Sequence, residues 1–175
     1  MAPFEVIASP LLDYLANGLV YSSIIVLGSI GLSLIYSIAG FANFAHGDTM
    51  TVGAYSALVT FGFVGAVGGG VLGLPLGFFL ALLAGAAIAA VVAVATERLV
   101  YRPLDTDRIG LLITSIGIAF IYRSVIRMRF GSDFVRFDIQ ALRPIEWLLP
   151  YGVRITRHDV AIVLSAVVLV GSLHV

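Results

Sequence analysis

Cysteine and lysine are both absent from this chain of 175 residues, and formal charge is scarce. Without cysteine there is no disulfide, no thiolate metal ligand and no thiol nucleophile. Without lysine there is no phosphate-binding loop of the GxxxxGK[ST] type, since all ten basic residues are arginines. The charged share is 11%, less than half of the roughly 25% of a typical soluble domain. The ten basic and ten acidic residues cancel, so no basic tail points to nucleic acid.

Long uncharged runs take the place of the missing charge. No formal charge occurs from Tyr14 to Gly47, and none from Thr49 to Thr96. The mean hydropathy is +1.08. Uncharged apolar runs longer than about 18 residues indicate transmembrane helices. We therefore expect an all-α protein, a polytopic transmembrane helical bundle that forms a single domain over 1–175.

Four or five membrane spans fit into this length. The expected spans cover residues 15–38, 49–64, 76–95, 109–128 and 160–175. Six glycines and Pro75 in the stretch from Val64 to Gly77 indicate the turn between the second and third spans. The fourth span has to continue past Arg123 to cross, and a re-entrant helix is the alternative. The sequence stops inside the expected fifth span, and we therefore expect the chain to be truncated.

Two charged segments separate the later spans. Residues 97–108 are expected to form a loop in which Arg98 and Arg102 favour the cytoplasm. Pro103 should end any helix that continues from the third span. Residues 129–159 mix acids, arginines and aromatics, which is typical of a loop or a small amphipathic element on the membrane.

Polar residues interrupt the apolar runs at Gly40–Asp48. This stretch carries an amide, an imidazole and a carboxylate between glycines, and polar groups among spans normally face protein or a water-filled path. Glycine permits a broken helix whose free N–H and C=O groups can bind solute. The candidate translocation-path or helix-break residues are Gly40, Asn43, His46, Gly47 and Asp48. The alternative is a tight turn between two spans, with Asp48 capping the second helix.

Signs of catalytic chemistry are absent from the sequence. His46, His158 and His174 have no metal-ligand spacing, and there is no nucleophile elbow or paired-carboxylate motif. We expect no catalytic residue, no metal site and no cofactor, and therefore not an enzyme.

Three blocks resemble a known family. Gly31-Leu-Ser-Leu-Ile-Tyr36, Gly40-Phe-Ala-Asn-Phe-Ala-His-Gly47 and Glu97-Arg-Leu-Val-Tyr-Arg-Pro103 look like permease subunits of ABC importers for branched-chain (hydrophobic) amino acids. The resemblance runs in order from about Asn17 to Tyr122. Urea and short-amide permeases are close relatives that share the same blocks.

The resemblance implies a multi-pass subunit of the cell (plasma or inner) membrane, surrounded by membrane lipid, that lines a solute pathway. An extracytoplasmic solute-binding protein would deliver the solute, and a second homologous permease subunit would stand beside this one. ATP-binding cassette subunits would hydrolyse the ATP on the cytoplasmic side. The family's coupling segment follows the span that begins near Val160, which implies that 97–108 is cytoplasmic and 129–159 extracytoplasmic.

Three other functions stay open at this point. The first is the same machine carrying urea or short amides. The second is a proton-coupled secondary transporter that uses His46 and Asp48, because imidazole titrates near neutral pH. The third is a purely structural membrane scaffold, which leaves the polar interruption at Gly40–Asp48 unexplained.

Overall fold

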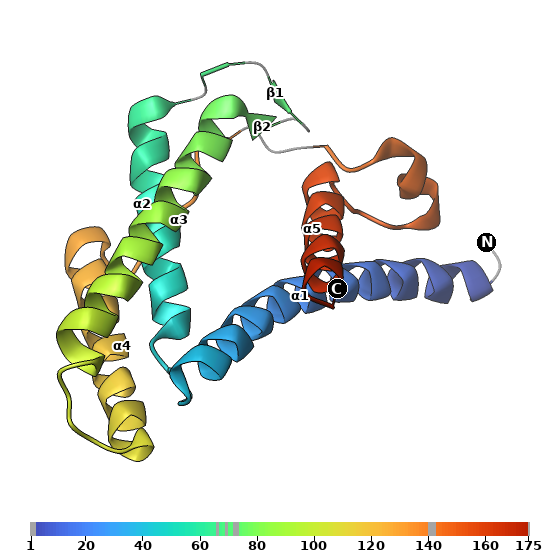
Figure 1. The fold of residues 1–175 in the computed structure, drawn as a ribbon. Helices are drawn as coiled ribbons and strands as arrows, with labels where there is room; N and C mark the ends of the chain where they lie inside the picture. Colours follow the sequence, from blue (N-terminus) through green and yellow to red (C-terminus); the bar gives the residue numbers. More distant parts are fainter. Residues whose placement is uncertain (1–2, 66, 69, 72–73, 140–142, 175) are drawn as a thin grey trace. The chain divides into compact units, whose positions relative to one another are not determined.

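Helices dominate the computed structural model, which describes residues 3–65, 67–68, 70–71, 74–139 and 143–174. The element order within these residues is α1 (Pro3–Ala39), α2 (His46–Val64), β1 (Gly70–Val71), β2 (Leu74–Pro75), α3 (Leu76–Thr96), a π-helix (Glu97–Tyr101), α4 (Arg108–Phe130), a 3-10 helix (Glu146–Tyr151) and α5 (Arg157–His174) (Figure 1). The two short strands pair antiparallel in the connection between α2 and α3. The predicted all-α fold class is confirmed.

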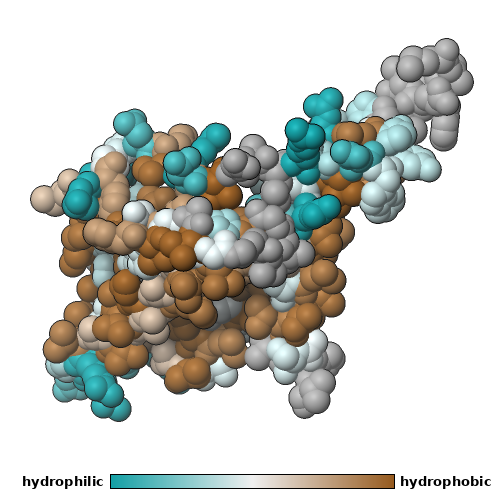
Figure 2. Space-filling view, turned by 90° about the horizontal axis from the view of Figure 1, so that it is seen from above, coloured by the Kyte–Doolittle hydropathy of each residue, from teal (hydrophilic) through white to brown (hydrophobic). Residues whose placement is uncertain are grey.

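Three stretches of helix in the described residues are long and apolar enough to cross a membrane. They are Pro10–Ala39, Leu76–Tyr101 and Arg108–Phe130. The spans expected at 49–64 and 160–175 fall on α2 and α5, which are helical but not among these three, so their crossing stays a prediction. Large apolar side chains such as Phe63 and Met128 are exposed, and apolar residues dominate the surface in Figure 2. Lipid accounts for such a surface, since hydrocarbon is as apolar as these side chains.

Residues 31–139 form one compact unit in which α2 packs antiparallel against α3. Small residues make the contact: Gly53 and Ala57 on α2 meet Gly85 on α3, and all three are buried, as is Ala81 one turn before Gly85. A Cβ added at Gly85 would lie 2.5 Å from the Gly53 carbonyl oxygen and 2.7 Å from the Ala57 Cβ. The two backbones thus touch, as membrane helices do where small residues meet. We call these four residues the α2–α3 seam.

Helix α4 runs parallel to α2 in the same unit. Contacts occur in the same order along both helices: the Phe44 N–H donates to Ser115 Oγ (3.0 Å), and the Tyr55 and Phe130 rings lie 4.6 Å apart. Ser115 is fully buried, and its own hydroxyl donates to the Leu112 carbonyl (2.7 Å). The start of α2 is therefore held against the interior of α4 and not against either end of that candidate span.

The charged segments differ in part from the prediction. Residues 97–101 do not form a loop but continue α3 as a π-helix, because the Arg102 N–H donates to the Glu97 carbonyl (2.8 Å). Arg98 is therefore helical, and the linker is restricted to 102–107. The helix ends before Pro103, as predicted, and Asp107 caps α4 by accepting from the Gly110 N–H (2.9 Å).

The described residues up to Ile30 and from Arg143 onward form a second unit. Within it, the Arg154 N–H donates to Asp13 Oδ1 (2.8 Å). Helix α5 begins at Arg157, three residues before the expected Val160. Thr156 and Asp159 hold this start, since the Thr156 N–H and hydroxyl both donate to Asp159 Oδ2 (2.8 and 2.7 Å).

Candidate functional site: a pocket at the helix break

The helix break lies between Ala39 and His46 and is shaped by Gly40 and Asn43. Gly40 has a φ of +74°, a left-handed conformation that favours glycine, and its N–H donates to the Tyr36 carbonyl (2.9 Å). Asn43 Oδ1 accepts from the Ala45 N–H (3.0 Å), and the Asn43 carbonyl accepts from the His46 N–H (3.2 Å). The side chain of Asn43 therefore directs the turn into α2.

Asp48 does not cap α2, so that part of the alternative turn interpretation was wrong. Helix α2 begins at His46, and its N-cap residue, Ala45, makes no side-chain cap bond. Asp48 lies in the first turn, where the helix dipole favours a carboxylate. Its two oxygens accept from Arg123 Nε and Nη2 at 3.2 and 3.1 Å, in a fork that joins α2 to α4. Asp48 is 13% exposed and Arg123 51%, so solvent reaches the arginine side of the pair.

His46 turns toward α1 and rests against Gly31. A Cβ added at Gly31 would lie 2.9 Å from His46 Nε2, so the imidazole occupies space that any larger residue would take. Nε2 is buried and has no hydrogen-bond partner among the described residues. Gly47, which we expected to help break the helix, is an ordinary helical residue: a Cβ there meets nothing within 4 Å. The special backbone conformation belongs to Gly40.

The π-helix brings Tyr101 to the break. A π turn adds one residue to the helical repeat and so changes the direction of the side chains that follow it. The Tyr101 hydroxyl donates to Asn43 Oδ1 (3.4 Å), and its ring meets the edge of Phe41 at 5.3 Å and 74°. Both rings are buried.

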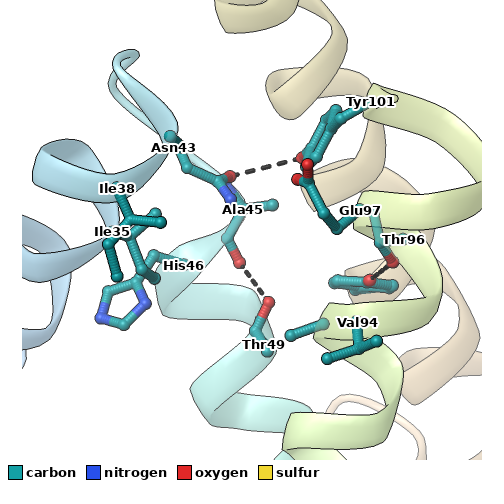
Figure 3. A pocket seen from close by; sticks show the side chains of 13 residues that line it. Ile35, Ile38, Asn43, Ala45, His46, Thr49, Val94, Thr96, Glu97 and Tyr101 are labelled. Carbon is teal, nitrogen blue, oxygen red and sulfur yellow. Dashed lines mark hydrogen bonds between the residues drawn. The ribbon is translucent and has the colours of Figure 1, made fainter. Parts of the chain in front are cut away.

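A pocket of about 320 Å³ opens between the end of α1, the break, the end of α3 and α4 (Figure 3). Its lining is mainly aliphatic, with a few polar groups. The lining residues are Ile35, Ile38, Ala39, Asn43, Ala45, His46, Thr49, Ala93, Val94, Thr96, Glu97, Tyr101 and Tyr122. An apolar wall with a few convergent polar groups is typical of sites that bind small organic molecules.

The predicted candidate residues divide between this pocket and its surroundings. Asn43 and His46 line it, whereas Gly40, Gly47 and Asp48 do not. Asp48 instead borders a separate pocket of about 200 Å³ together with Arg123 and Arg127. The cytoplasmic-loop candidates Arg98, Arg102 and Pro103 line neither of these two pockets.

Sequence reasoning missed five polar lining residues: Thr49, Thr96, Glu97, Tyr101 and Tyr122. The hydroxyls of Thr96 and Tyr122 hydrogen-bond to each other across α3 and α4. The available signal was a polar pair, Thr96-Glu97, at the end of an uncharged run of 48 residues (49 to 96). The prediction for 97–108 places Glu97 at the start of a loop and gives Thr96 no role.

The lining of the pocket suits the binding of a small solute. Within the described residues, no group of three or more His, Cys, Asp or Glu side chains could hold a metal ion. Aliphatic walls and hydrogen-bonding groups at one end suit a small amphipathic solute.

Comparison with known proteins gives one family. The model of the family described as "Branched-chain amino acid transport system / permease component" matches residues 14–171. The high-affinity branched-chain amino acid transport system permease protein BraD of Pseudomonas aeruginosa is 30% identical over 122 residues. The corresponding permease protein LivH of Escherichia coli K12 is 32% identical over 126 residues. Each alignment covers 69% of this chain and 39% of the relative, so the chain matches well under half of their length. No solved structure gives a significant match.

Proposed function

Because the chain belongs to the family of permease components of branched-chain amino acid transport systems, we propose that it forms part of the membrane pathway of an ATP-driven importer for branched-chain or other hydrophobic amino acids. The family match over residues 14–171 carries this proposal. It also agrees with the three apolar helices of a multi-pass protein of the cell membrane.

The pocket at the helix break is our candidate for a part of the pathway. It lies among predominantly apolar helices, and its aliphatic lining includes Ile35, Ile38 and Val94. Such a wall would accept a branched aliphatic side chain, while Asn43 and Tyr101 supply polar groups at one end. A helix break is a common way for membrane transporters to expose polar groups to a solute.

The proposed machine needs partners. ATP-binding cassette subunits would hydrolyse ATP, a second homologous permease would complete the pathway, and an extracytoplasmic binding protein would deliver the solute. In this arrangement residues 102–107 face the cytoplasm, and residues 131–139 and 143–156 face the outside.

A proton-coupled transporter is less well supported by the geometry. His46 rests against Gly31 and lines the larger pocket, whereas Asp48 is paired with Arg123 and borders the smaller one. The two groups therefore face different surroundings and do not form a continuous relay. Permeases for urea or short amides share the sequence blocks, but the matched relatives are named for branched-chain amino acids.

The test is uptake of labelled leucine by the purified permease, reconstituted in liposomes with its ATP-binding subunits and binding protein. We expect accumulation that needs hydrolysable ATP and the binding protein. Excess valine should compete and excess urea should not. Uptake that persists with a non-hydrolysable ATP analogue and collapses with the proton gradient would instead support the secondary transporter.

A further inference from the structure

Oxygen atoms gather at the polar end of the pocket. Asn43 Oδ1 already accepts from the Ala45 N–H and the Tyr101 hydroxyl. Because the Tyr101 hydroxyl directs its proton to Asn43, its lone pairs are left for another donor. Figure 3 shows the Glu97 side chain reaching toward this hydroxyl. This end of the pocket therefore presents mainly hydrogen-bond acceptors, one of them a carboxylate.

Glu97 differs from the other carboxylate in this unit's apolar helices. Asp48 is held by Arg123, but Glu97 has no arginine or histidine of the described residues within 4 Å of its carboxylate. It belongs to the apolar stretch Leu76–Tyr101 and lines the pocket. Glu97 is exposed at the edge of this cavity, so a cationic group that enters the pocket can reach its carboxylate and form a charge-assisted hydrogen bond with it.

We infer that Glu97 receives the ammonium group of a hydrophobic amino acid, while the solute's aliphatic side chain rests against Ile35, Ile38 and Val94. This inference rests on the proposed function and names the chemical group, an ammonium, by which the pocket would recognise its solute. A primary ammonium has three N–H donors, which match the acceptors of Glu97 and the Tyr101 hydroxyl. A neutral amide or urea brings no charge for Glu97, so the same pocket would favour amino acids over them.

The first test is Glu97→Gln, which keeps the shape of the side chain and removes its charge. Losing a hydrogen bond to a charged group should lower the initial rate of leucine uptake by about tenfold or more. Asp105→Asn is the matched control, because Asp105 is an exposed carboxylate on the 102–107 linker that does not line the pocket. Both variants should co-purify with the partner subunits in normal yield. A Glu97→Gln permease that assembles and transports leucine at the wild-type rate would overturn the inference.

The second test addresses the ammonium directly and does not need transport. Dicyclohexylcarbodiimide modifies carboxyl groups in apolar membrane sites, and mass spectrometry of the assembled wild-type permease measures its reaction at Glu97. We expect 3-methylbutylamine, which has the ammonium and the branched chain, to slow modification severalfold. The control compound 3-methylbutanoate, which has the branched chain and no ammonium, should not. Equal protection by both compounds, or by neither, would contradict ammonium recognition.

The two tests separate failure of the inference from failure of the proposed function. If the wild-type permease does not take up leucine with ATP and binding protein, the proposed function is wrong. Protection of Glu97 by the amine would then still identify an ammonium site. If leucine uptake is normal and Glu97→Gln has no effect, only the inference is wrong.

Discussion

Two regions of α2, its middle and its start, pack against their neighbours in opposite ways. In the middle of α2, the α2–α3 seam is made of four small buried residues, Gly53, Ala57, Ala81 and Gly85, with backbone against backbone. At the start of α2, amide, imidazole, phenol and carboxylate groups surround a pocket of about 320 Å³. The seam has no room for a methyl group at Gly85, whereas the break leaves space and an imidazole nitrogen that has no hydrogen-bond partner in the described part of the chain.

This difference shows which part of the unit serves stability and which serves binding. A seam held by dispersion forces needs only size and shape. A buried polar atom without a partner costs free energy, so a membrane protein retains one mainly where something else uses it. Changes in the seam should therefore lower stability, and changes at the break should lower transport.

The largest effect on stability is expected from one methyl group at Gly85. In Gly85→Ala the new Cβ would meet the Gly53 carbonyl and Ala57 at 2.5 and 2.7 Å, both parts of a facing helix that cannot rotate away. We expect a loss of about 1–3 kcal/mol of stability, or failure to yield monodisperse protein. The measurement is thermal unfolding of the purified permease in detergent.

Gly62→Ala on α2 is the matched control for Gly85→Ala. A Cβ at Gly62 meets nothing within 4 Å, so the change should be neutral or slightly stabilising. Equal melting temperatures for the two variants would show that the seam is not closely packed and would remove the contrast with the break.

The next effect is expected on transport rather than stability, at Gly31. Gly31→Ala would place a methyl group 2.9 Å from His46 Nε2, and the imidazole, as the end of a mobile side chain, should turn away toward the pocket. We expect a severalfold loss of leucine uptake with little change in melting temperature. Gly47→Ala, also at a helical glycine but in open space, should leave uptake unchanged.

A double variant tests whether Gly31 acts through His46. In a His46→Ala background, Gly31→Ala should have no further effect, which corresponds to a coupling energy on the order of 1 kcal/mol. Additive losses would mean that Gly31 serves helix packing alone.

Local patterns in the sequence predicted the helices and the break but not the partners across the unit. Uncharged runs and glycine clusters located the helices, and Gly40, Asn43 and His46 proved to shape or line the site. The seam was hidden because α3 is so rich in alanine that a small-residue register carries no information. Nothing local could indicate that Asp48 pairs with Arg123, 75 residues away.

The part of the site on α3 escaped prediction for a different physical reason. Assigning 97–101 to an α-helix or to a loop does not predict where the Tyr101 side chain points, because the π turn changes the direction of the side chains that follow it. Neither periodicity nor propensity encodes a single π turn. The acceptor-rich end of the pocket could therefore be recognised only in three dimensions.

A smaller effect is expected from the ion pair between Asp48 and Arg123. Asp48→Asn removes the charge of one partner, but Arg123 is half exposed, so solvent and salt weaken what is lost. We expect a decrease of at most about 1 kcal/mol in stability at low salt and less at high salt. Asp48→Arg combined with Arg123→Asp should recover part of it, as measured by melting temperature. A loss that does not depend on salt and is not recovered would show that Asp48 has a role beyond the pair.

The smallest effect on stability is expected from Tyr101→Phe, which sharpens the comparison between the seam and the break. The ring would keep its edge contact with Phe41 at 5.3 Å, and only the 3.4 Å hydrogen bond to Asn43 would be lost. Since that bond is long, its loss should cost no more than about 0.5 kcal/mol. Tyr101→Leu, which also loses the ring contact, should lower the melting temperature further. If Tyr101→Phe transports leucine normally, the hydroxyl only holds Asn43 in place. If uptake falls while the melting temperature stays constant, the hydroxyl belongs to the binding end of the pocket.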